Sequence, residues 1–191
     1  MLAGAALERF GRIDVIVNNA GVSLHRSAAE TTVEDVEQVT AINYFGAVYL
    51  TMAALPHLLE RRTGSVINVT SVAGYLPNAM EAAYGASKAA LSRWSHGLTV
   101  DLHDTGVHVG AISPGPIETE IWADPDDDYH GKMYPPEVVA DGVVRMVEHR
   151  MVHLTVPRQF GAVGVMYPFA GRPMRWGIRR FATPKPASKQ P

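Results

Sequence analysis

Tyr84 and Lys88 are the two residues whose types and spacing point most directly to chemistry. They stand four positions apart in a predicted helix over residues 83–103, so their side chains share one face and an ammonium can lie beside a phenol. A phenol with a pKa near 10 exchanges protons poorly at neutral pH, and lowering that pKa by about three units requires roughly 4 kcal/mol. One ammonium at about 4 Å, with an effective dielectric of about 20, supplies about that much. We therefore interpret the pair as an acid/base centre in which Lys88 lowers the pKa of Tyr84.

Three short runs of β-branched and other apolar residues, at 14–17, 65–69 and 107–112, each end in polar, Gly or Pro residues. Runs of this kind predict buried parallel strands. Open α/β sheets bind their ligands beyond the carboxyl ends of the strands, so the residues after each run are candidate site residues. These are Asn18, Asn19, Ala20 and Gly21 after the first run, Ser71 after the second, and Pro114 and Gly115 after the third.

Helical stretches lie between and after these strands. The first opens with a capping box, Thr31 followed three residues later by Glu34, and the second ends just before Gly106, which suits a C-terminal cap. The predicted elements are helices at 31–50, 83–103 and 135–149, with a last strand at 154–156. Alternating strands and helices predict an α/β fold, a doubly wound parallel sheet with right-handed crossovers. We expect a partial catalytic domain over residues 1–160 and a basic C-terminal helix and tail over 161–191.

Five motifs in unbroken order, from Phe10 to Thr119, resemble the short-chain dehydrogenase/reductase family. GRIDVIVNNAG is similar to the family's fourth-strand motif, INYFG to its asparagine-bearing helix, and GSVINVTSVAG to its serine strand. YGASKAAL resembles the catalytic helix and SPGPIET the loop over the nicotinamide. The resemblance implies a Rossmann-type sheet and an oxidoreductase. Such an enzyme transfers a hydride between NAD or NADP and a small-molecule carbonyl or secondary alcohol.

The resemblance also implies roles for individual residues. Tyr84 would be the proton donor or base, and Ser71 would bind the substrate oxygen. Lys88 would lower the pKa of Tyr84 and contact the nicotinamide ribose, and Asn43 would support a water-linked proton path to Lys88. Besides Tyr84 and Lys88, the implied cofactor contacts are Asn18, Asn19, Ala20, Gly21, Pro114, Gly115, Ile117 and Thr119.

The sequence departs from the family pattern at its start. The family begins with a strand, a glycine-rich turn and a helix whose N-terminus receives the pyrophosphate, and none of the 17 glycines forms that motif. Two βαβ units of roughly thirty residues each are therefore expected to be missing, which would leave an incomplete sheet. The apolar strand around Ile16 would then lie at an edge of the sheet, where it invites aggregation. We expect a truncated or mis-started chain, which an intact-mass measurement on protein from the native source would test.

Composition narrows the class of protein further. The chain has 47% apolar residues, no cysteine, and no uninterrupted run of eighteen apolar residues, so we expect a cytoplasmic protein without disulfides or thiolate chemistry. His149 and His153 are four apart, but Arg150 stands where the metalloprotease pattern has Glu, so no metal site is expected.

Charge is distributed unevenly along the chain. Residues 1–150 carry 10 Lys/Arg against 19 Asp/Glu, whereas residues 151–191 carry 7 against none. The basic, aromatic tail is consistent with a solvated end, an anionic or acyl-carrier contact, packing between subunits, or weak peripheral contact with a membrane. The acidic body argues against nucleic acid as a partner. The helices around Asn43 and Tyr84 resemble the family's dimer-forming pair, which implies a homo-oligomer. The alternative to an enzyme is a non-catalytic remnant of the fold, a regulatory or binding subunit.

Overall fold

A parallel sheet of four strands forms the centre of the computed structural model, which describes residues 2–122 and 131–161. The strands are β1 (Val15–Asn18), β2 (Gly64–Val69), β3 (Val107–Pro114) and β4 (His153–Val156), and they lie side by side in chain order. Each pairs in parallel with the next, with Val15 opposite Ser65 and Gly64 opposite Val107. The predicted α/β class and all four predicted strands are confirmed. The predicted basic tail lies, apart from Gly161, outside the described residues.

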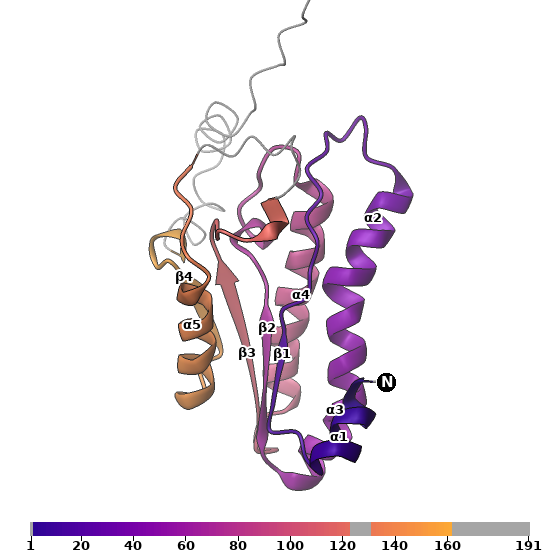
Figure 1. Ribbon diagram of the computed structural model, residues 1–191, viewed down its shortest axis with the longest axis vertical. Helices are drawn as coiled ribbons and strands as arrows, with labels where there is room; N and C mark the ends of the chain where they lie inside the picture. The colour runs from indigo at the N-terminus through magenta and orange to yellow at the C-terminus, as the bar shows by residue number, and fades with distance from the viewer. Residues whose placement is uncertain (1, 123–130, 162–191) are drawn as a thin grey trace, which may run out of the picture.

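Helices cover both faces of the sheet, as a doubly wound fold requires (Figure 1). One face packs against α5, and the other packs against α3 and α4, with α1 at the end where the strands begin (Figure 1). The helices are α1 (Leu2–Phe10), α2 (Val33–Thr40), α3 (Gly46–Arg61), α4 (Ala82–Asp101) and α5 (Glu137–Glu148), with a π turn η1 (Ala41–Phe45) and 3₁₀ turns η2 (Val72–Gly74) and η3 (Glu120–Trp122).

The first long helix differs from its prediction in two respects. Its capping box is formed by Thr32 and Asp35, one residue later than the predicted pair of Thr31 and Glu34. The Thr32 hydroxyl accepts from the Asp35 N–H at 3.2 Å, and the Asp35 carboxylate accepts from the Thr32 N–H at 2.9 Å. Thr31 instead donates its hydroxyl to the Ser27 carbonyl at 2.8 Å. The helical stretch also contains the π turn η1 between α2 and α3, and it runs on to Arg61 rather than ending near Leu50.

Side chains of the central strands alternate between two hydrophobic cores. On β2, Val66 belongs to the core beneath α3 and α4, where it packs with Leu58 and Leu98. The next residue, Ile67, belongs to the core beneath α5, which contains Met146. Because β2 and β3 are buried on both faces, an unbroken apolar run is the expected sequence of each.

Strand β1 forms one edge of the described sheet and is covered on one face only. Ile16 is buried among the residues beneath α3 and α4, whereas Val15 and Val17 point to the other face and are 44% and 43% exposed. The expectation that this apolar strand lies at a sheet edge is therefore confirmed for the described residues. Asp14, just before the strand, forms ion pairs with Arg61 and Arg12, each at 3.0 Å.

A ladder of buried polar side chains joins β1 and β2 to the helices behind them. The Asn18 amide donates to Thr51 Oγ1 on α3 at 3.0 Å and to Asn68 Oδ1 on β2 at 2.7 Å. The Asn68 amide donates in turn to Ser95 Oγ on α4 at 2.8 Å. Asn68 and Ser95 are fully buried, so these groups depend on one another for hydrogen bonds. The ladder therefore sets how α3 and α4 lie against the carboxyl ends of the strands.

Replacing Asn68 with leucine tests the ladder. Asn68→Leu removes the acceptor of Asn18 and the donor to Ser95, so we expect the free energy of unfolding in urea to fall by about 2 kcal/mol. Asn19→Ala removes an exposed asparagine two positions after Val17 and should change it by less than about 0.5 kcal/mol. Equal effects of the two substitutions would show that the ladder contributes nothing.

Candidate active site

Four of the predicted site residues meet at the carboxyl edge of the sheet. Ser71 lies two residues beyond β2 and caps the turn η2, accepting from the Ala73 N–H at 3.1 Å. Tyr84 and Lys88 lie in the first two turns of α4, and Asn43 lies in the π turn. The predicted strand and helix positions thus bring together side chains that are up to 45 residues apart in the sequence.

The hydroxyl of Ser71 lies close enough to the phenol of Tyr84 to lower its pKa. Two glycines allow the turn that carries Ser71 to approach α4 closely enough. A Cβ on Gly85 would lie 2.8 Å from the Ala73 carbonyl oxygen, and one on Gly74 would lie 3.1 Å from the Ala89 backbone nitrogen. Larger residues at these positions would push the serine turn away from the helix. The glycines of the VAG and YGASK motifs therefore have a packing role.

Lys88 is buried, and among the residues that the structure describes its one hydrogen-bond partner is the Val69 carbonyl at the end of β2. Its Nζ donates to that oxygen at 3.0 Å, and the residue is 3% exposed. Because burial disfavours the charged ammonium, the pKa of Lys88 is lowered to about 8. The ammonium lies 6.0 Å from the centre of the Tyr84 ring.

The pKa of Tyr84 is shifted in the direction opposite to the one expected from its spacing to Lys88. Burial is the largest cause and raises the pKa of Tyr84 to about 12, the Ser71 hydrogen bond lowers it, and the charge of Glu81 raises it further. The expectation that Lys88 lowers this pKa is therefore wrong for the arrangement found here. The ammonium is directed to the Val69 carbonyl, and desolvation of the phenolate outweighs it. Tyr84 is accordingly a protonated phenol at neutral pH.

Asn43 is 1% exposed and is fully engaged by neighbouring groups. Its Oδ1 accepts from the Val22 N–H at 2.8 Å, and its Nδ2 donates to the Val22 carbonyl at 2.9 Å and to Ser87 Oγ at 3.0 Å. Ser87 donates to the Tyr84 carbonyl at 2.7 Å. Asn43 therefore ties the loop after β1 to the helix that carries Tyr84. The π turn directs it there, a kind of helix irregularity that is frequent at functional sites.

The loop after β1 provides a surface for a ligand next to Lys88. Asn19, Ala20 and Gly21 are exposed, whereas the Asn18 side chain turns inward and belongs to the buried ladder. A Cβ on Gly21 would lie 3.1 Å from Lys88 Nζ and 3.1 Å from the Asn43 side-chain oxygen. A side chain here would fill the cradle in front of the ammonium, which glycine leaves open.

The segment after β3 lies at the same edge of the sheet. Pro114 and Ile117 are buried, Gly115 is partly exposed, and Thr119 is exposed. The Gly115 N–H donates to the Val156 carbonyl at 2.8 Å, which ties the segment to the end of β4. The residues after β1, β2 and β3 thus gather at one edge of the described sheet.

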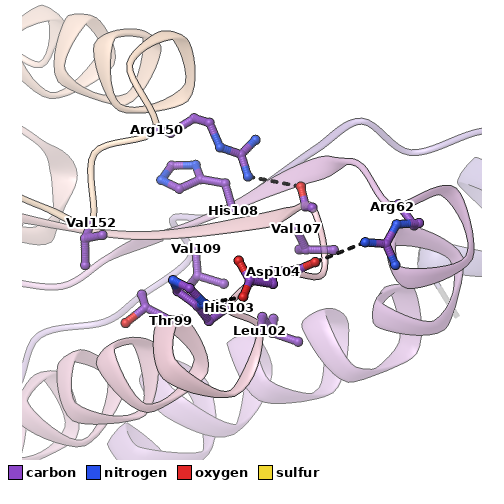
Figure 2. A pocket seen from close by; sticks show the side chains of 11 residues that line it. Arg62, Thr99, Leu102, His103, Asp104, Val107, His108, Val109, Arg150 and Val152 are labelled. Carbon is purple, nitrogen blue, oxygen red and sulfur yellow. Dashed lines mark hydrogen bonds and ion pairs between the residues drawn. The ribbon is translucent and has the colours of Figure 1, made fainter.

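A pocket at the opposite end of the sheet is a separate feature (Figure 2). It surrounds the start of β3, with Val107, His108 and Val109 in its wall. Arg62 donates to the Asp104 carbonyl at 3.1 Å, and Arg150 to the Gly106 carbonyl at 3.0 Å (Figure 2). Both guanidinium groups hold the turn between α4 and β3. Because ligands of open α/β sheets bind at the carboxyl ends, we place the active site at Tyr84 rather than here.

Some residues at the site were missed by the sequence reasoning. Asn68 and Ser87 both hold site residues in place, and a usable signal existed for each. Asn68 is a polar residue inside an otherwise apolar strand, and Ser87 stands three residues after Tyr84 on the same helix face. The contact between His25 and Glu81 had no such signal, because 56 residues separate the two.

Comparisons with known proteins agree with the fold and with the order of the motifs. The chain matches the family model described as short chain dehydrogenase over residues 1–130. It is 36% identical over 140 residues to an uncharacterized oxidoreductase of Staphylococcus epidermidis, an alignment that covers 73% of this chain and 60% of that protein. The chain therefore belongs to the short-chain dehydrogenase family. It spans about 60% of the length of the curated relatives that it matches first.

Solved structures of the family have the same arrangement. A short-chain dehydrogenase from Streptomyces avermitilis superposes with a TM-score of 0.78 at 26% identity, covering 94% of this chain and 73% of that one. ElxO with NADP bound superposes with a TM-score of 0.75 at 26% identity, covering 81% and 70%. The predicted Rossmann-type class of the sheet is thereby confirmed.

The pKa of Lys88 predicts how stability changes with pH. In the unfolded chain Lys88 keeps its proton up to its ordinary pKa of 10.5, whereas in the folded chain its pKa is about 8 and the proton is released near that pH. Burial of the ammonium therefore costs up to about 3 kcal/mol below pH 8, and this cost declines as the pH rises from 8 to 10.5. Lys88→Met should raise the free energy of unfolding at pH 7, by less than this because the Val69 carbonyl loses its partner.

Urea unfolding between pH 6.5 and about 10.5 checks this expectation. The gain from Lys88→Met should shrink over the upper half of that range. Lys132→Met removes an exposed lysine and serves as the control, for which no such pH-dependent gain is expected. A gain from Lys88→Met that is constant with pH would contradict the assignment of a buried, desolvated ammonium.

Proposed function

We propose that this protein is an NAD(P)-dependent oxidoreductase that reduces a carbonyl group of a small molecule to a secondary alcohol. The observation that carries the proposal is the grouping of Ser71, the phenol of Tyr84 and the Lys88 ammonium, whose Nζ lies 6.0 Å from the centre of the Tyr84 ring. These groups lie at the carboxyl edge of a parallel sheet, where folds of this type bind nucleotides. The proposed catalytic residues are Asn43, Ser71, Tyr84 and Lys88.

The cofactor is proposed from the shape of the edge and from the family. The open surface at Asn19, Ala20 and Gly21, with the cradle in front of Lys88 Nζ, fits a nicotinamide riboside placed against the ammonium. Gly115 and Thr119 would contact the cofactor from the opposite side of the same sheet edge. The NADP named for ElxO, a related structure, favours NADP as the form to test first. When bound, the nicotinamide supplies the hydride for the carbonyl carbon.

Each residue of the site has a separate task in this reaction. Ser71 Oγ donates a hydrogen bond to the substrate oxygen and orients the carbonyl. Tyr84 Oη gives its proton to that oxygen as negative charge develops on it. Lys88 offsets the negative charge left on the phenolate. Asn43 binds Val22 and so keeps the loop after β1 at a fixed distance from α4. The proton lost from Tyr84 is then restored from solvent.

The protonated state of Tyr84 is the state that carbonyl reduction requires. With a pKa of about 12, the phenol carries its proton throughout the neutral range, but it is a weak acid, so proton transfer must accompany the charge that develops on the substrate oxygen. Alcohol oxidation needs the phenolate, which this site disfavours. A non-catalytic member of the family that binds a partner remains the alternative, and it is distinguished by the absence of turnover.

Removal of the phenolic hydroxyl tests the proposed reaction. Tyr84→Phe should lower the rate of NADPH-dependent reduction of a responsive carbonyl compound by about 10²- to 10⁴-fold, because the proton donor is lost. NADPH binding, followed by its fluorescence, should change little. Tyr49→Phe removes the hydroxyl of an exposed tyrosine on α3 and is the matched control. Turnover that is indifferent to Tyr84→Phe would refute the role of this residue. Binding without any turnover on a broad panel would support the non-catalytic alternative.

We also propose that the protein forms a homo-oligomer through α3. The outer face at the end of η1 and the start of α3 exposes Phe45, Tyr49 and Met52, which are 42%, 67% and 50% exposed, and the first two rings stack at 5.9 Å. By length and composition alone, the helical stretch Val33–Arg61 is long and apolar enough to cross a membrane. One side of it packs on the sheet, so a second copy of the chain would cover the side that remains.

A charge on this face should dissociate the oligomer. We expect Tyr49→Glu to shift the mass measured by light scattering toward the monomer, because it places a carboxylate in an apolar interface. Val144→Glu introduces the same charge at an exposed apolar residue of α5 and should leave the mass unchanged. A wild-type mass equal to that of Tyr49→Glu would exclude an interface at α3.

A further inference from the structure

The start of α4, which carries Tyr84, lacks the usual local support. Its N-cap residue, Glu81, makes no side-chain capping bond to the helix, so the first N–H groups rely on other partners. The residue before it, Met80, has a left-handed backbone with φ of 63°, which costs about 1–2 kcal/mol for a residue other than glycine. A turn of this kind opens readily unless neighbouring groups hold it.

The loop between β1 and α2 holds the start of α4 through the Met80 carbonyl and the Glu81 carboxylate. The Arg26 N–H donates to the Met80 carbonyl at 2.8 Å, and His25 Nε2 lies 2.7 Å from Glu81 Oε1. The second carboxylate oxygen of Glu81 accepts from Asn78 Nδ2 at 2.7 Å. The side chains of His25 and Glu81 are only 15% and 9% exposed, so water competes little for these bonds.

These contacts close a circuit around the candidate active site. From Tyr84 the chain of bonds passes through Ser87 to Asn43, and Asn43 holds both backbone groups of Val22. The same loop then continues to His25, which returns to Glu81 at the start of α4. Gly21, whose missing side chain leaves the cradle open in front of Lys88, adjoins Val22 and so lies within this circuit.

We propose that His25 and Glu81 are positioning residues for Tyr84, which lock the loop after β1 onto the first turn of α4. The proposal rests on the proposed function, because it assigns to the pair the task of holding the proton donor at a fixed separation from the Gly21 cradle. Neither residue belongs to the family motifs quoted above. Pairing is available whenever His25 Nε2 carries a proton, so the lock does not require a charged imidazole.

The electrostatic surroundings of the pair agree with this role. The charge of Glu81 raises the pKa of Tyr84, so the carboxylate acts on the phenol through space. Ser23, which lies 3.3 Å from His25 Nδ1, and Asn78 are uncharged. The nearby guanidinium of Arg26 is engaged by Asp35 at 2.6 Å. Of the two side chains that bond the Glu81 carboxylate in the described part of the chain, only His25 is ionisable, and the pair can act as one unit.

Three variants separate positioning from general stability. His25→Ala removes the lock. His25→Gln retains an N–H donor at nearly the position of Nε2 and should preserve it. His103→Ala is the matched control, because it breaks a histidine–carboxylate pair of similar length, 3.0 Å to Asp104, that is largely exposed just beyond the other end of α4. All three substitutions are introduced into the complete product of the protein's own gene.

Amide hydrogen exchange and steady-state kinetics are the two measurements. For His25→Ala we expect exchange at residues 22–26 and 80–85 to accelerate about tenfold or more, the factor given by loss of a hydrogen bond to a charged group. We expect kcat for carbonyl reduction by NADPH to fall by a similar factor while KM for NADPH changes less than twofold. His25→Gln should restore most of both quantities, and His103→Ala should alter neither.

Each outcome decides a separate point. Exchange that is unchanged in His25→Ala would overturn the lock, and accelerated exchange with unchanged kcat would overturn its role in positioning Tyr84. If His25→Ala does not fold, a tenfold difference in exchange at 80–85 between His25→Gln and His25→Asn, whose amide is one methylene shorter, supports the lock, and equal exchange overturns it. Absence of turnover in the wild type would refute the proposed function alone, since exchange tests the lock without substrate.

Discussion

Burial of the Lys88 ammonium against the carboxyl end of β2 is the constraint on which the rest of the site depends. A cation with one carbonyl partner is unfavourable inside a protein, so the surrounding fold must hold it there. The polar ladder from Asn18 to Ser95 holds α4 against the sheet, and Gly74 and Gly85 let the serine turn approach closely. The reactive groups are thus assembled by parts of the structure that take no part in the chemistry.

Most of the architecture could be predicted because its signals are local. Apolar runs that end in Gly, Pro or Asn mark buried parallel strands, and their carboxyl ends locate the site. The spacing of Tyr84 and Lys88 places both residues correctly on one helix. The cap was missed because TTVED contains two overlapping boxes, and only the path of the preceding loop selects Thr32 and Asp35.

The properties that could not be predicted depend on burial and on distant contacts. The direction in which the pKa of Tyr84 is shifted follows from how deeply the phenol is buried and from where Lys88 Nζ points. The spacing of the two residues specifies neither. Asn18 belongs to a motif associated with the cofactor, yet its side chain faces into the sheet. His25 and Glu81 meet only because the loop after β1 folds over the start of α4.

The π turn between α2 and α3 determines which residues of α3 face the interior of the protein and which face its surface. The Gly46 N–H reaches back five residues to the Ala41 carbonyl instead of four. One residue corresponds to a rotation of about 100° around a helix, so this extra residue sets which side of α3 faces outward. With it, Asn43 points inward while Tyr49 points away from the sheet. Deleting one residue within 41–45 would turn the whole outer face of α3 by more than a quarter of a circle, a change that no single substitution can produce.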